Sequence, residues 1–191
     1  LVRALKGFEL ILSHSHKMIF IKTRKTAGSS VEAALRGFLR HDDFATSIPG
    51  ELDAHGWLDR KSPGLRNAHQ HMTAYEIYRL VGKKVWQDYV KVAVHREPGD
   101  FLISCYFWYT RNQTEKPGFD LWVKRNWTFV VSQHVIAPTT GTLKIDHELR
   151  FHSLQKDFDD LGLEGVPRGS VPGANKAKAN LRPQQTLDVQ G

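Results

Sequence analysis

Residues 17–39 read KMIFIKTRKTAGSSVEAALRGFL, and this stretch decides the fold class. It opens with a short apolar run, residues 18–21, whose β-branched and aromatic side chains suit a buried strand. A basic turn that contains one glycine follows at residues 22–28. Apolar side chains then recur at helical spacing, namely Val31, Ala34, Leu35, Phe38 and Leu39. The order of strand, turn and helix predicts a β–α unit of an α/β protein.

The turn has the composition of an anion-binding site. A helix N-terminus offers free backbone N–H groups and the positive end of the helix dipole. Ser29 and Glu32 have the Ser-x-x-Glu spacing of a capping box, which predicts that the helix begins there. Mobile positive charge and hydroxyl donors are supplied by Lys22, Arg24, Lys25, Thr26, Ser29 and Ser30. An ordinary turn with solvated lysines would show the same pattern, so the turn alone leaves both interpretations open.

A second possible anion-binding unit follows the clearest strand in the sequence, residues 89–95. This strand runs into Arg96-Glu97-Pro98, and proline suits the first turn of a helix. Arg96 lies at the strand's carboxyl end, where α/β folds bind ligands, and Ser104 follows eight residues later. Arginine can bind a phosphate through two parallel charge-assisted bonds. The alternative is a structural arginine paired with Glu97 or Asp100.

Two histidines, His69 and His71, stand just before a predicted helix over residues 72–81 that Gly82 ends. Thr73 and Glu76 predict a capping box at its start. A histidine there could act as a general base, ligate a metal or have no role, and the pattern leaves these open.

The remaining pattern predicts one domain over residues 1–191. Residues 1–16 are expected to be an N-terminal extension with a polar linker, and residues 40–68 a long loop. Helices are expected over residues 119–134 and 154–161, a strand over 143–151, and a flexible tail at about 183–191.

Charge and cysteine content narrow the function classes. The formal net charge of +7 suggests an anionic partner, but the basic residues are dispersed, so a nucleic-acid partner is not expected. Cys105 is the single cysteine, which excludes an internal disulfide. The sequence contains no apolar run of about 18 residues, so no membrane-spanning helix is predicted.

The two units together resemble the sulfotransferases that use 3′-phosphoadenosine-5′-phosphosulfate (PAPS), in particular the carbohydrate and Golgi-type branch and its bacterial relatives. Residues 24–30, RKTAGSS, match the family's 5′-phosphosulfate loop, and Arg96-Glu97-Pro98 with Ser104 match its 3′-phosphate motif. Further family segments are resembled by residues 71–81, 88–94 and 141–158 and by Asn175-Lys176, so the resemblance covers most of residues 17–182.

The resemblance implies a three-layer α/β/α fold with a central parallel sheet, related to the P-loop nucleotide-binding proteins. It also implies in-line transfer of a sulfuryl group from PAPS to an acceptor hydroxyl, of a carbohydrate in this branch, or to an amine, with 3′-phosphoadenosine 5′-phosphate (PAP) as product and no metal. Lys25 would stabilise the leaving phosphate, and His71 would be the base with His69 in reserve. The 5′-phosphosulfate would be held by Arg24, Lys25, Thr26, Ala27, Gly28, Ser29 and Ser30, and the 3′-phosphate by Arg96 and Ser104.

The sequence departs from the family pattern at three positions. Phe101 stands where many relatives carry arginine, Glu97 replaces aspartate or asparagine, and His152 replaces glutamate. A P-loop-like kinase or NTPase is a rival, although Ser29 rather than lysine follows Gly28. A basic module that binds nucleic acid or acidic glycan without catalysis is another. The expected location is the cytoplasm for a bacterial protein, or the Golgi lumen if an N-terminal anchor has been removed before Leu1.

Overall fold

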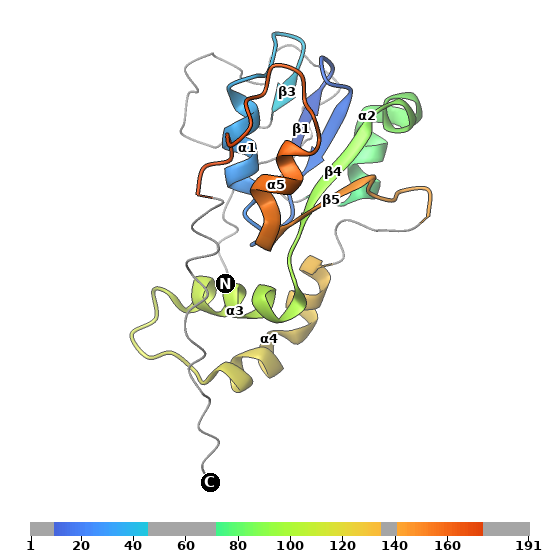
Figure 1. Ribbon diagram of the computed structural model, residues 1–191. Coiled ribbons are helices and arrows are strands. Elements are labelled where there is room, and N and C mark those ends of the chain that lie inside the picture. Colours follow the sequence, from blue (N-terminus) through green and yellow to red (C-terminus); the bar gives the residue numbers. More distant parts are fainter. Residues whose placement is uncertain (1–9, 46–71, 135–140, 174–191) are drawn as a thin grey trace.

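The computed structural model describes residues 10–45, 72–134 and 141–173, and Figure 1 shows how their elements are arranged. The elements are β1 (Leu10–Ser13), β2 (Met18–Ile21), α1 (Gly28–Arg36), β3 (Phe44–Ala45), α2 (Ala74–Asp88), β4 (Val90–His95), α3 (Pro98–Thr110), α4 (Phe119–His134), β5 (His147–Arg150), a 3₁₀ turn (Phe151–Ser153) and α5 (Leu154–Asp159). The mixture of strands and helices confirms the predicted α/β class.

The five strands form one mixed sheet in the order β3-β1-β2-β4-β5. Strands β2, β4 and β5 are parallel, with Phe20 beside Val92 and Val94 beside Leu149. Strand β1 runs antiparallel to both β2 and β3. The prediction of a parallel sheet therefore holds for the pairings among β2, β4 and β5 and is wrong for β1, which is antiparallel to both of its neighbours.

Strand β1 corrects the prediction that residues 1–16 are an extension with a polar linker. All four of its residues are buried, and it lies between β2 and β3. Ile11 packs in the core cluster on one face of the sheet and Leu12 in the cluster on the other. A strand that is buried on both faces has no alternation of polar and apolar residues. Periodicity alone therefore does not distinguish such a strand from a short apolar stretch in a linker.

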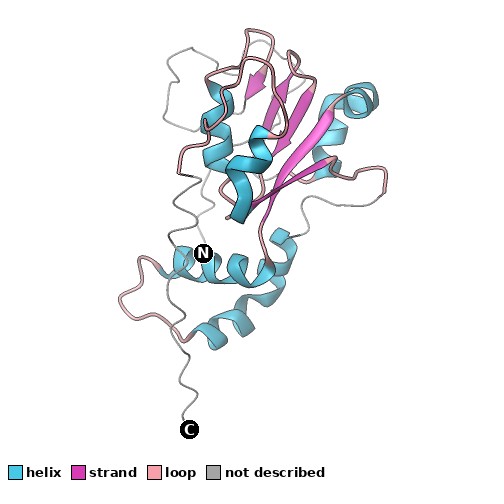
Figure 2. Ribbon diagram, viewed as in Figure 1, coloured by secondary structure: helices cyan, strands magenta, loops and turns pink. Residues whose placement is uncertain are grey.

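Helices cover both faces of the sheet, and two further helices lie beyond it (Figure 2). Helices α1 and α5 pack on one face, where Val31, Leu35 and Phe158 join the core. Helix α2 packs on the other face through Ile77 and Trp86. Helices α3 and α4 pack on each other around a separate small cluster.

The capping box predicted at Thr73 is confirmed. Its hydroxyl accepts from the Glu76 N–H at 3.2 Å, and the Glu76 carboxylate accepts from the Thr73 N–H at 2.7 Å. Gly82 ends the first helical segment, as the sequence predicted, because its backbone leaves the helical region with φ of 83° and ψ of 161°. A second helical segment follows this kink as far as Asp88, and the two segments together make up α2.

Other predicted bounds change in smaller ways. Helix α4 confirms the helix predicted over residues 119–134. Strand β5 is shorter than the predicted 143–151, and α5 ends at Asp159. The predicted loop 40–68 contains β3, and its residues 46–68 lie outside the described residues, as does the tail at 183–191. In the part of the chain that the structure describes, no helix has the length and apolarity needed to cross a membrane.

Candidate functional site

The turn between β2 and α1 is built on an unusual backbone. Lys25 and Ala27 have positive φ values of 55° and 67°, a left-handed conformation that costs a non-glycine residue about 1–2 kcal/mol. Ala27 is the N-cap of α1, and no side chain caps the helix. The predicted capping box at Ser29 is therefore wrong. Such strain persists only where the surroundings enforce it, and it is frequent at ligand-binding sites.

Glu32 does not cap α1 because it is used inside the protein. Its carboxylate accepts from the Lys22 ammonium at 3.0 Å and also pairs with Arg36. Lys22 and Glu32 are 6% and 3% exposed. Burial lowers the pKa of Lys22, and Glu32 opposes that shift. Lys22 is thus a buried structural cation rather than the mobile charge that its place in the turn predicted.

The side chain of Lys22 leaves no room for a side chain at position 28, which is why glycine stands there. A Cβ at Gly28 would lie 2.5 Å from Cγ of Lys22, closer than real carbon contacts. The start of α1 therefore packs directly on the stem of a buried lysine, and glycine is the residue that leaves room for it.

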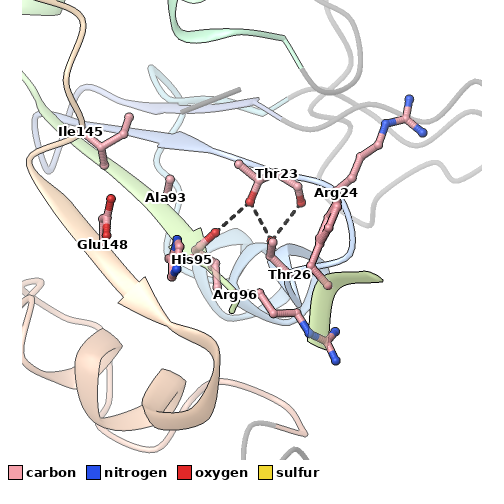
Figure 3. A pocket seen from close by; sticks show the side chains of 10 residues that line it. Thr23, Arg24, Thr26, Ala93, His95, Arg96, Ile145 and Glu148 are labelled. Atoms are coloured by element: carbon pink, nitrogen blue, oxygen red, sulfur yellow. Dashed lines mark hydrogen bonds between the residues drawn. The ribbon is translucent and has the colours of Figure 1, made fainter. Parts of the chain in front are cut away.

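Two threonines tie the turn to the neighbouring strand (Figure 3). The Thr26 hydroxyl donates to the Thr23 carbonyl at 3.0 Å, and the Thr23 hydroxyl donates to the Val94 carbonyl at 2.9 Å. The two hydroxyl oxygens are 2.7 Å apart. Thr26 is 5% exposed, so its hydroxyl supports the turn from within. On α1, Ser29 is exposed and Ser30 is half-buried.

The two units that the sequence singled out meet at a hydrogen bond. The Arg96 Nη1 group donates to the Lys25 carbonyl at 3.0 Å, although 71 residues separate them in the sequence. The guanidinium of Arg96 also lies over the Phe151 ring, 4.0 Å from its centroid. Burial lowers the pKa of Arg96, and Asp100 opposes that shift. Arg96 and Lys25 therefore belong to one site.

The side chain of Lys25 lies against α3. Its ammonium is 4.0 Å from the centroid of the Trp108 ring. Burial lowers the pKa of Lys25, and the positive charges of Arg96 and Arg111 lower it further. Among the described residues, no carboxylate lies within 4.0 Å of this ammonium. An anion placed there would meet a cation that is not already neutralised.

Arg24 also contacts α3, the helix that carries Ser104. Arg24 Nη1 donates to the Tyr109 hydroxyl at 3.5 Å, while its buried Nε has no hydrogen-bond partner among the described residues. Ser104 is half-buried on α3, one turn before Trp108. Burial raises the pKa of the Cys105 thiol on α3 to about 11, and the nearby positive charges of Lys25, Arg96 and Arg24 oppose that shift.

A shallow hollow, open to solvent and with an inner volume of only about 30 Å³, lies beside the turn. It is lined by Thr23, Arg24, Thr26, Ala93, Val94, His95, Arg96, Phe101, Ile145 and Glu148. In Figure 3, Ile145 and Glu148 lie at one end of the hollow and Arg24 at the other, with the threonine pair between them. Phe101, where the resemblance leads us to expect arginine, is one of these lining residues.

The histidines have different outcomes. His69 and His71, the predicted bases, lie outside the described residues. His152 pairs with Asp100, with 2.6 Å between Nε2 and Oδ2. Because its neighbour Phe151 stacks on Arg96, His152 lies at the Arg96 side of the site.

Three residues of the site, Thr23, Trp108 and Tyr109, are not among those that the sequence pattern indicates. Their part in the site depends on how α3 packs against the turn, a contact between segments far apart in the sequence. The position of Trp108, one turn after Ser104 on the same helix, is the signal that could have indicated it.

Comparison with known proteins adds no relative. No family model, no curated protein and no solved structure matches this chain at a significant level.

Proposed function

We propose that this chain is a sulfotransferase that moves a sulfuryl group from PAPS to an acceptor hydroxyl, of a carbohydrate or another molecule, or to an amine. The observation that carries the proposal is that Lys25 and Arg24, in the turn before α1, both lie against α3, while Arg96 donates to the Lys25 carbonyl. PAPS carries anionic groups at both its 5′ and its 3′ positions. Two basic units joined by a 3.0 Å hydrogen bond suit such a ligand better than two unconnected sites would.

In this proposal, each of the candidate binding residues is assigned to one end of the nucleotide. Lys25 and the first turn of α1, with the hydroxyls of Ser29 and Ser30, would hold the 5′-phosphosulfate. Arg96 and Ser104 would hold the 3′-phosphate. Lys22 is excluded from this set by its pairing with Glu32, and the Thr26 hydroxyl acts within the turn. The P-loop-like sulfotransferase fold is part of the same proposal, supported by the β2–turn–α1 unit beside parallel β4.

In the proposed reaction, the acceptor oxygen forms a bond to sulfur while the bond from sulfur to the 5′-phosphate oxygen breaks. The leaving phosphate takes the electron pair, and the acceptor proton passes to a base, His71 or in reserve His69. Lys25 would neutralise the charge that develops on the leaving phosphate. Positioning and charge stabilisation supply most of the rate in such in-line transfers.

Calorimetry with PAP tests the binding half of the proposal. We expect the wild-type chain to bind PAP, and Arg96→Ala to bind it about 10- to 100-fold more weakly, as loss of a charged hydrogen bond predicts. The matched control is Arg79→Ala, an exposed arginine on α2. Equal PAP affinity in wild type and Arg96→Ala would contradict the assignment. Preference for Mg·ATP would indicate a kinase or NTPase, and binding of nucleic acid alone a binding module.

Transfer of radiolabelled sulfate from PAPS to a panel of acceptors tests the catalytic half. Lys25→Ala and His71→Ala should abolish transfer without unfolding the protein, whereas the exposed Lys84→Ala should transfer normally. Near-normal turnover in Lys25→Ala would remove that residue from the mechanism.

A further inference from the structure

The contact between Arg96 and Lys25 joins the two ends of the candidate nucleotide site. Arg96 follows β4, while Lys25 lies in the turn after β2. The Lys25 carbonyl that Arg96 holds belongs to a residue with φ of 55°. A hydrogen bond on that carbonyl therefore stabilises a backbone conformation that the residue would otherwise adopt at a cost.

The geometry of arginine allows it to serve two partners at once. A guanidinium presents five N–H groups in one plane, and one of those on Arg96 is donated to the Lys25 carbonyl. The stacking on Phe151 uses the flat face of the group, whereas hydrogen bonds are made in its plane. The stacking and the carbonyl contact therefore do not compete with a phosphate that approaches in the plane.

Lys25 is also held at its other end. Its ammonium lies 4.0 Å from the centroid of the Trp108 ring. The backbone carbonyl and the side-chain tip thus have separate anchors, Arg96 and Trp108. If the Arg96 guanidinium becomes less mobile, the Lys25 carbonyl becomes less mobile as well, because a single hydrogen bond joins the two groups.

We propose that Arg96 couples the two phosphate sites, so that a 3′-phosphate bound to its guanidinium orders the Lys25 turn and strengthens binding of the 5′ group. This inference rests on the proposed function and adds a positioning role to Arg96. A 3′-phosphate that fixes the guanidinium also fixes the donor to the Lys25 carbonyl. The 5′ group then binds to a turn that is already ordered, so its binding loses less conformational entropy. The two phosphates should bind together more tightly than the sum of their separate effects.

The test is a four-ligand cycle by calorimetric displacement, with PAP, adenosine 5′-phosphate, adenosine 3′-phosphate and adenosine. In the wild type, we expect adding the 3′-phosphate to improve affinity at least fivefold more when the 5′-phosphate is present than when it is absent. Arg96→Lys keeps the positive charge but loses the planar set of N–H donors. In this variant PAP should still bind, but the 3′-phosphate should improve affinity by about the same factor with and without the 5′-phosphate. Arg79→Lys on α2 is the control, and circular dichroism checks that each variant is folded.

The outcomes separate this inference from the proposed function. Additive phosphates in the wild type would overturn the coupling and leave PAP binding intact, as would coupling that persists in Arg96→Lys. Failure of the wild type to bind PAP would defeat both. The wild-type cycle needs no variant, so an unstable Arg96→Lys protein leaves the coupling itself measurable.

Discussion

Gly28 is the residue whose side chain, or lack of one, decides the shape of the turn. A methyl group there would meet the stem of Lys22, and Lys22 cannot easily move because Glu32 holds its ammonium at 3.0 Å. Gly28→Ala should therefore lower the free energy of unfolding by about 1–3 kcal/mol, as overpacking does. Chemical denaturation measures this, and PAP affinity should fall as well.

Gly37 is the matched control for that change. It follows the same helix with φ of −65°, and a Cβ there would meet nothing within 4 Å. Gly37→Ala should be neutral or stabilising by a few tenths of a kcal/mol. If both alanine variants were equally stable, the close contact at Gly28 would not control the turn.

Trp108 is the residue whose side chain positions the Lys25 ammonium. Cation–π contacts contribute about 0.5–2 kcal/mol, so Trp108→Ala should slow sulfuryl transfer about 2- to 30-fold if Lys25 acts as proposed. Trp108→Phe should restore part of the rate because it retains an aromatic face. The control is Trp127→Ala, a tryptophan on α4 that is 55% exposed. A loss of rate in Trp127→Ala as large as in Trp108→Ala would indicate a general effect on the α3–α4 pair.

At the scale of elements, the starts of α1 and α2 differ in how they are capped. Thr73 caps α2 through its hydroxyl, whereas no side chain caps α1. Thr73→Ala should destabilise the protein by about 1 kcal/mol, and Ser29→Ala should have an effect below about 0.5 kcal/mol. Thermal denaturation of the two variants measures the difference. A loss in Ser29→Ala equal to that in Thr73→Ala would restore the capping box that the sequence predicted.

The junction between β5 and α5 should be sensitive to acid. Hydrogen bonds from Arg150 lower the pKa of Asp157 to about 2, against an ordinary value near 3.8. Its carboxylate also accepts from the Ser153 hydroxyl at 3.0 Å. Because the folded-state pKa is the lower one, the contribution to stability is present above about pH 4 and is lost as pH falls toward 2.

Asp157→Asn should therefore lose about 1–3 kcal/mol of stability at neutral pH, since it weakens several hydrogen bonds to a charged group. Its stability should also fall less steeply than that of the wild type between pH 4 and 2. Denaturation across this pH range measures both effects. The exposed Asp160→Asn on the same segment is the control, and a surface pair of this kind contributes at most about 1 kcal/mol. Equal acid sensitivity in wild type and Asp157→Asn would refute the assignment.

At the scale of the whole molecule, β1 connects the two faces of the sheet. Ile11 is 1% exposed and packs with residues of α1 and α5, while the next residue packs on the α2 side. Ile11→Ala should cost about 2–5 kcal/mol, as other large-to-small changes in a core do. Val90→Ala, at a position 40% exposed, should cost less than about 1 kcal/mol. Urea denaturation compares them, and a small loss in Ile11→Ala would mean that β1 contributes little to the core.

Local patterns in the sequence were enough for the elements whose residues interact with near neighbours. Residues 18–21 and the capping box at Thr73 follow from side-chain type and spacing within a few positions. The same reasoning failed at Glu32, because its partner Lys22 lies across the turn and is buried with it. It failed again at β1, because a short apolar run acquires a place in the sheet only by pairing with β2 and β3.

The sequence by itself determined the α/β class, the strand–turn–helix unit and the choice of Lys25, Arg96 and Ser104 as candidates. Only the tertiary structure decided that Lys25 and Arg96 share a hydrogen bond and that Trp108 holds the lysine. It also decided that Lys22 is neutralised. The physical reason is that charge availability depends on burial and on partners far away in the chain. Residue type and spacing indicate where cations can gather, and packing selects which of them can meet an anion.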